Sequence, residues 1–239
     1  DRFGNAVIDA WLASEGRTAT SFHPVERLCY VGSRGMGALE YEPSTFGPPD
    51  SRNAVEVASL VRLANKILDE RNSLGGAFTP DDDREIIQDI LRVGTSAGGA
   101  RPKAVLAWNP KTDEFRSGQV DVESGFEHWL MKFDGVSNVP GAELAESQGY
   151  GRIEYAYHSM AVEAGINMSP CRLHHEGGRS HFMTKRFDRT AKGRRIHMQS
   201  LSAMAHFDYK QPAIYSYEQA IQVMKRLELT REDLEQQVL

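Results

Sequence analysis

Thr95-Ser-Ala-Gly-Gly-Ala-Arg-Pro-Lys103 is the stretch that decides the fold, and the features that follow it along the chain give it meaning. An apolar strand at 128–133 carries Lys132, the next helical pattern has Glu154 near its start, and a hairpin then ends in Thr184-Lys-Arg-Phe-Asp188. A glycine-bearing loop can cover phosphates with backbone N–H groups, a strand lysine can neutralise them, and a helix carboxylate can hold that lysine. This order predicts a nucleotide-binding lobe made of a sheet and a helix.

The setting of the loop separates it from the common nucleotide-binding folds. Thr79-Pro80, followed by acidic residues, indicates a helix start, and the helical pattern runs until Gly94. The loop therefore leads from a helix into the strand predicted at 104–108, whereas a Walker or dinucleotide loop leads from a strand into a helix. A protein-kinase-like small lobe fits the order, although neither a His-Arg-Asp catalytic loop nor an Asp-Phe-Gly motif follows it in the sequence.

Composition and charge are those of an ordinary globular protein. The 239 residues are 40% hydrophobic and 26% charged, and the formal net charge of −5 gives no overall nucleic-acid footprint. The apolar stretches are far shorter than the roughly 18 residues that cross a bilayer, and Cys29 and Cys171 are isolated. We therefore expect a cytoplasmic protein without membrane contact. Because the sequence begins without Met and ends inside a helical pattern, we interpret it as a fragment.

Hydrophobic periodicity predicts an α+β protein in three parts. Residues 1–50 are interpreted as the end of an N-terminal subdomain and a linker, residues 51–189 as the kinase-like lobe with preceding helices, and residues 190–239 as the start of a helical C-terminal lobe. Helical patterns cover 1–15, 24–30, 53–75, 79–94, 152–164, 200–206, 216–227 and 230 onward, and strands are expected at 104–108, 114–118, 128–133, 171–175 and 180–187.

Periodicity also predicts which way individual side chains face. Alternation in the third strand places Lys132 on the face opposite Trp129, where a partly buried ammonium group needs an anionic partner. In the helix that follows this strand, we expect Tyr157, Met160 and Ala161 to form the inward apolar stripe.

With these features, the sequence resembles the HipA family, bacterial serine/threonine kinases that act as toxins of type II toxin–antitoxin modules. Asp1-Arg-Phe-Gly-Asn5 is similar to the family's junction after its N-terminal β subdomain, and residues 95–103 resemble its Ser-x-x-Gly-Ala-x-x-Lys loop. Lys132 resembles its nucleotide lysine, and Arg186-Phe-Asp-Arg189 resembles the end of its hinge strand. The likeness runs over essentially the whole sequence and implies a kinase-like N-lobe followed by a mostly helical C-lobe.

The resemblance also implies a ligand and site residues. ATP is the expected nucleotide and Mg²⁺ the expected metal. The residues expected to bind the nucleotide are Ser96, Gly98, Gly99, Lys103, Lys132, Lys185 and Phe187. Ser96 is also the expected autophosphorylation site, while Lys185 and Phe187 bracket the adenine, although Lys185 stands where many members have an acidic residue. The catalytic Asp, the metal-binding Asn and a further metal-binding Asp are expected beyond Leu239, so no catalytic or metal residue is assigned within the sequence.

The partners that the resemblance implies are macromolecules. They are a HipB-like antitoxin, operator DNA reached through that antitoxin, and a protein substrate with a Ser or Thr acceptor. The site residues also have simpler interpretations: Ser96 could be a turn serine, Lys132 an exposed strand lysine, and Glu154 a solvated first-turn acid. A different class of function stays open, in which the basic segment at 185–195 and Trp108 contact nucleic acid or protein. A small-molecule phosphotransferase would use the same lobe.

Three further patterns invite a site but favour structure. His174, His175 and His181 lie on facing strands, yet no carboxylate or Cys stands at ligand spacing, so cross-strand packing is favoured over a metal site. Phe133-Asp-Gly135 is expected to form a turn and not a metal site. The glycine-rich stretch at 31–37 lacks the Lys-Ser or Lys-Thr and the helix start of a phosphate loop, so it is expected to pack against its own domain.

Overall fold

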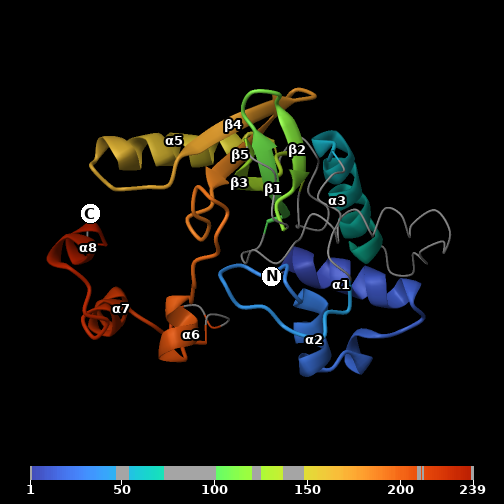
Figure 1. The fold of residues 1–239 in the computed structure, drawn as a ribbon, viewed down its shortest axis with the longest axis horizontal. Helices are drawn as coiled ribbons and strands as arrows, with labels where there is room; N and C mark the ends of the chain where they lie inside the picture. Colours follow the sequence, from blue (N-terminus) through green and yellow to red (C-terminus); the bar gives the residue numbers. More distant parts are fainter. Residues whose placement is uncertain are drawn as a thin grey trace.

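The computed structural model describes residues 2–46, 54–72, 101–119, 125–136, 148–208, 211 and 213–237. Within these ranges the chain is an α+β protein with a five-stranded antiparallel sheet and helices on both sides of it in the sequence (Figure 1). The helix predicted at 79–94 and the loop residues Ser96, Gly98 and Gly99 lie outside the described residues.

The described helices and strands confirm the predicted elements, with ends shifted by a few residues. The helices are α1 (Arg2–Ser14), α2 (Pro24–Val31), α3 (Val57–Asn72), α5 (Tyr150–Glu163), α6 (Leu201–Ala205), α7 (Tyr217–Met224) and α8 (Arg231–Gln236), with a short 3₁₀ helix, η1 (Ala19–Ser21). The strands are β1 (Lys103–Asn109), β2 (Glu114–Ser117), β3 (Glu127–Lys132), β4 (Cys171–Glu176) and β5 (Arg179–Lys185). Side-chain oxygens of Ser200, Ser216 and Thr230 cap α6, α7 and α8, as their residue types favour. Among the described residues, no helix is long and apolar enough to cross a membrane.

The sheet has the strand order β2-β1-β3-β5-β4, and every neighbouring pair is antiparallel. Cross-strand partners point to the same face, so the register assigns the side chains of the central strands to two faces. The core face carries Ala104, Leu106, Trp108, Trp129, Met131 and Met183, and the lysine face carries Lys103, Val105, Ala107, His128, Leu130, Lys132, Phe182 and Thr184. The prediction that Lys132 and Trp129 lie on opposite faces is therefore confirmed.

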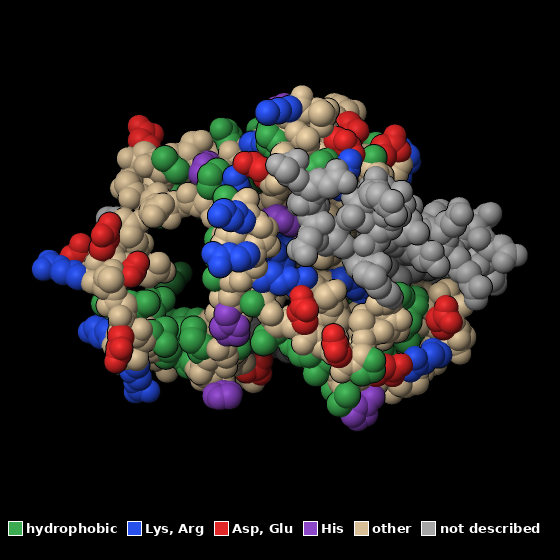
Figure 2. Space-filling view, viewed as in Figure 1, with side chains coloured by type: hydrophobic (Ala, Val, Ile, Leu, Met, Phe, Trp, Pro, Cys, Tyr) green, Lys and Arg blue, Asp and Glu red, His purple; other side chains and the backbone are tan. Residues whose placement is uncertain are grey.

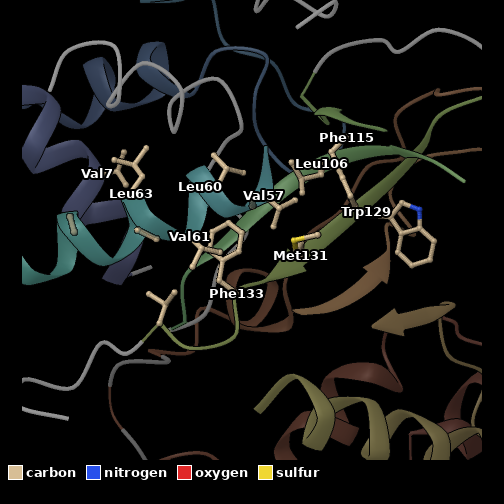
Figure 3. Packing of buried hydrophobic residues seen from close by; sticks show 14 of the residues in the cluster. Val7, Val57, Leu60, Val61, Leu63, Leu106, Phe115, Trp129, Met131 and Phe133 are labelled. Atoms are coloured by element: carbon tan, nitrogen blue, oxygen red, sulfur yellow. The ribbon is translucent and has the colours of Figure 1, made fainter. Parts of the chain in front are cut away.

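The hydrophobic core joins the N-terminal helices to the core face of the sheet (Figure 3). Leu106 and Met131 of the sheet are fully buried, and Val7 of α1 and Leu60 of α3 belong to the same buried cluster. The sheet also curls around this face, because Arg172 at one edge stacks its guanidinium 3.8 Å from the ring centroid of Trp108 near the other edge. The lysine face is left to α5, which packs against β4 and β5 (Figure 1).

The structure corrects the predicted inward stripe of α5. Tyr157 is 68% exposed and Met160 is 62% exposed, whereas Gly151 is buried and Ala161 is half-buried. The reason is the close contact between the first turn of α5 and β5: a Cβ atom at Gly151 would lie 1.9 Å from the carbonyl oxygen of Ser180. This contact turns the small residue inward and leaves the larger apolar side chains of the helix outside.

A buried ion cluster, which we name the hinge clasp, holds the chain after β5 to the N-terminal helices. Its members are Arg186, Asp188, Arg189 and Gly37. Asp188 accepts from Arg186 Nε at 2.8 Å and Nη2 at 2.7 Å, from Arg189 Nη1 at 2.9 Å, and from the backbone N–H of Gly37 at 2.7 Å. Burial alone would raise the pKa of Asp188, but these hydrogen bonds and the two arginine charges outweigh it and hold the pKa below its ordinary value.

The clasp also explains the glycine-rich stretch at 31–37. Gly37 has φ +75°, and a Cβ atom there would lie 3.1 Å from the backbone nitrogen of Met198. Arg189 donates to the carbonyl oxygen of Gly37, and Arg195 donates to that of Ser33. The loop therefore packs against the segment that follows β5.

Candidate functional site

The candidate site begins with an ion pair between a strand and a helix. Lys132 is the last residue of β3, and its Nζ hydrogen-bonds to Oε2 of Glu154 on α5. The ammonium group also lies 5.7 Å from the ring centroid of Phe182 on β5. Both charged side chains are about one-third exposed, at 31% and 27%, so a ligand can still reach them. Glu154 is thus the partner of Lys132 and not a solvated first-turn acid.

A second lysine lies beside the first. Lys103 on β1 is the register partner of Lys132 and is only 4% exposed. Burial, and then the charge of Lys132, lowers the pKa of Lys103 to about 8, with Glu154 acting in the opposite direction. The two lysines point to the same face of the sheet, and lysine ammonium groups on such a face can neutralise phosphate oxygens.

Two further predicted nucleotide residues, Lys185 and Phe187, lie at and just after the end of β5. Lys185 is the last residue of this strand, and its Nζ pairs with Oε1 of Glu127 at 2.6 Å. Phe187 is 66% exposed, so its ring is open to solvent. The backbone N–H of Arg186 still donates to the carbonyl oxygen of His128 at 2.9 Å, which keeps the hinge aligned with β3. The adenine contacts assigned to Lys185 and Phe187 stay a prediction.

A cavity of about 480 Å³ lies beside this hinge. It is lined by Gly125, Phe126, Glu127, His128, Lys185, Arg186, Arg189, Thr190, Ala191, Lys192 and Gly193. Burial and then the charges of Arg186 and Arg189 lower the pKa of His128 to about 4. The His128 side chain that lines the cavity is therefore a neutral imidazole at pH 7. Figure 2 shows Lys and Arg side chains over the segment that follows β5.

The histidines of the second hairpin belong to the packing of the sheet. His174 and His181 are cross-strand partners whose rings stack at 6.3 Å, and His174 also meets the ring of Phe115 at 4.9 Å. Within the described part of the chain, no three His, Cys, Asp or Glu side chains lie close enough together to hold a metal ion.

Three residues of the alternative basic contact surface at 185–195 with Trp108 lie inside the fold, whereas Lys192 and Arg194 of that segment are exposed. Trp108 is buried beneath Arg172, and its indole N–H donates to Asp113 at 2.7 Å. Arg186 and Arg189 pair with Asp188 in the hinge clasp, and their side chains are only 2% and 5% exposed. These three residues cannot meet a partner at the surface, because the fold uses them internally.

Sequence reasoning assigns neither of two residues that organise the site: it expects Asp134 only in the turn at Phe133-Asp-Gly135 and gives Gly151 no role. Asp134, in the turn after Lys132, accepts from the backbone of Gly149 and of Ser180. Gly151 allows α5 to touch β5. The only signal for Asp134 was an acid directly after a strand, and that pattern equally fits an ordinary turn.

The sequence of the region that carries this site matches a known protein family. Residues 95–239, more than half of the chain, match the HipA-like C-terminal domain. The chain belongs to the HipA family. No curated protein and no solved structure matches it. In this HipA-family chain, the matched range runs from the predicted phosphate loop through Lys103, Lys132 and Glu154 to the C-terminal helices.

Proposed function

We propose that this chain carries the ATP-binding lobe of a HipA-type protein serine/threonine kinase. The observation that carries the proposal is the ion pair between Lys132 and Glu154, on the same face of the sheet as Lys103. In protein kinases, a strand lysine pairs with a helix glutamate and with the nucleotide phosphates, and this pair must form before phosphoryl transfer. An antiparallel sheet with one helix across its lysine face supports the same proposal.

The hinge offers a place for the base. The chain leaves β5 at Lys185, and the exposed ring of Phe187 and the cavity beside His128 border this point. We propose that backbone groups of Lys185 and Phe187 receive the adenine while Lys103 and Lys132 face the phosphates. Ser96, Gly98 and Gly99 are proposed to cover the phosphates, and Ser96 stays the predicted autophosphorylation site.

Mg²⁺ would accompany the ATP phosphates, but the described residues do not make a site for it. Glu154 is engaged by Lys132, and within these residues no cluster of three potential ligands exists. Mg²⁺ needs oxygen ligands, commonly one or two carboxylates. On family membership, we propose that the metal-binding residues and the catalytic Asp lie outside the described residues. A HipB-like antitoxin, operator DNA bound through it, a Ser/Thr protein substrate and a cytoplasmic location are proposals that rest on family membership alone.

The test is calorimetric titration of the full-length protein with MgATP. Lys132→Met removes the charge while keeping the length of the side chain, and we expect at least tenfold weaker binding, about 1.4 kcal/mol. Lys111→Met is the matched control, because Lys111 is exposed in the turn between β1 and β2. Absence of MgATP binding to the unmodified protein, or equal affinity after Lys132→Met, would overturn the proposal.

A further inference from the structure

A buried carboxylate connects the end of β3 to the start of α5. Asp134 follows Lys132 by two residues and is only 3% exposed. Its Oδ1 accepts the backbone N–H of Gly149, the N-cap residue of α5, at 2.8 Å, and its Oδ2 accepts the backbone N–H of Ser180 on β5 at 3.2 Å. One side chain therefore binds the helix start and the neighbouring strand at the same time.

The position of Asp134 is itself fixed by a buried histidine. The backbone N–H of Asp134 donates to Nδ1 of His181 at 3.0 Å. Burial, and then the charge of His174, lowers the pKa of His181 to about 4, so the imidazole is neutral near pH 7 and Nδ1 can accept. The ring of Phe133 packs against His181 at 6.2 Å, edge to face. The turn that holds Asp134 is thus fixed to β5 by a buried hydrogen bond.

The first turn of α5 has little freedom to move against this anchor. A carboxylate beside a helix N-terminus is favoured by the helix dipole, and N-cap Gly149 has no side chain of its own to cap the helix. Gly151 contacts the backbone of Ser180 with no space for a Cβ atom. Arg101, at the end of the predicted phosphate loop, stacks its guanidinium 3.5 Å from the ring centroid of Tyr150.

We infer that Asp134 is a positioning residue of the nucleotide site: it fixes α5 so that Glu154 reaches Lys132. Glu154 lies five residues after Gly149 on the same helix, so a shift of the first turn moves its carboxylate as well. Sliding the helix by one residue, about 1.5 Å, would stretch a hydrogen bond of about 2.8 Å beyond any useful length. The inference rests on the proposed function, because it assigns Asp134 to the site through Lys132.

The test is a double-mutant cycle in the full-length protein, measured as MgATP affinity at a temperature where circular dichroism shows every variant folded. Asp134→Asn keeps the size of the side chain but offers one oxygen acceptor to two N–H groups. We expect Asp134→Asn alone to weaken MgATP binding about tenfold. In a protein that already carries Glu154→Gln, adding Asp134→Asn should weaken binding less than twofold further. Glu163→Gln, at the exposed far end of α5, should leave the affinity unchanged.

A second measurement reports the positioning without ATP. A carbodiimide joins a lysine and a carboxylate that are in contact, so the cross-link between Lys132 and Glu154 can be quantified by mass spectrometry. We expect Asp134→Asn to lower its yield at least threefold and Glu163→Gln to leave it unchanged. Equal loss of affinity in both backgrounds of the cycle, or an unchanged cross-link yield, would overturn the inference. A lowered yield in a protein that does not bind MgATP would instead refute the proposed function alone.

Discussion

Binding of MgATP should place a proton on Lys103. In the chain without nucleotide, burial and the charge of Lys132 lower the pKa of Lys103 from about 10.5 to about 8. Phosphates beside Lys103 favour the charged ammonium form, so they should return the pKa toward its ordinary value. The complex then binds more protons than the free protein wherever the pH lies between the two values.

The size of the effect follows from the two pKa values. At pH 8, Lys103 is about half protonated in the free protein and fully protonated in the complex, so about 0.5 proton is taken up on binding. From pH 7.5 to pH 9, the affinity for MgATP should fall about eightfold. The reason is that binding requires the uptake of a proton, and protons become scarcer in solution as the pH rises. The phosphates themselves contribute little in this range, since the last pKa of a phosphate monoester is about 6.

Calorimetry measures this uptake directly. The apparent binding enthalpy is recorded at pH 8 in buffers of different ionisation enthalpy, and the slope gives the number of protons taken up. Lys103→Met, which has a similar length and no charge, should bind more weakly and give a slope near zero. A slope near zero in the unmodified protein, or the same slope in both proteins, would refute the assignment of Lys103 to the phosphates.

Two further predictions concern the supports of the site. Asp188→Asn should lower the free energy of unfolding by about 3–5 kcal/mol in urea titrations at pH 7, because Arg186 and Arg189 stay buried without their carboxylate. The control is Asp9→Asn at an exposed position. A loss of unfolding free energy below about 1 kcal/mol for Asp188→Asn would contradict the reasoning. Because the folded-state pKa of Asp188 lies below its ordinary value, this difference should be complete above about pH 4 and shrink in more acidic solution. Gly151→Ala should lower both the melting temperature and MgATP affinity: the overlap with Ser180 at 1.9 Å outweighs the roughly 1 kcal/mol by which alanine favours a helix. A higher melting temperature for this variant would show that α5 can lift from β5 without loss.

The sequence predicts features that depend on neighbours along the chain. Turn residues and alternation locate the two hairpins, and capping residues locate the C-terminal helices. The pairing of Lys132 with a helix carboxylate is also suggested by the sequence, because a lysine on a half-buried strand needs an anion and Glu154 lies in the next predicted helix.

Features that depend on contacts distant in the sequence are the ones that sequence reasoning misses. The outward face of α5 looks like a core stripe, because Tyr157 and Met160 are apolar and the requirement for a small residue at Gly151 arises only from the approach of β5. Asp188 accepts from Gly37, which is 151 residues away. No local pattern signals that contact, although an acid between two arginines could have suggested an internal ion cluster.

The shared hydrophobic core has a consequence for how this domain can be combined with others. The family match begins at residue 95, but Val7 of α1 and Leu60 of α3 are buried in the same cluster as Leu106 and Met131. The start of the matched sequence is therefore not the boundary of the folded unit. A fusion could join the matched region to an unrelated N-terminal part. That part would then have to supply two apolar helix faces of matching shape, because otherwise the core face of the sheet that carries both lysines would be exposed to water.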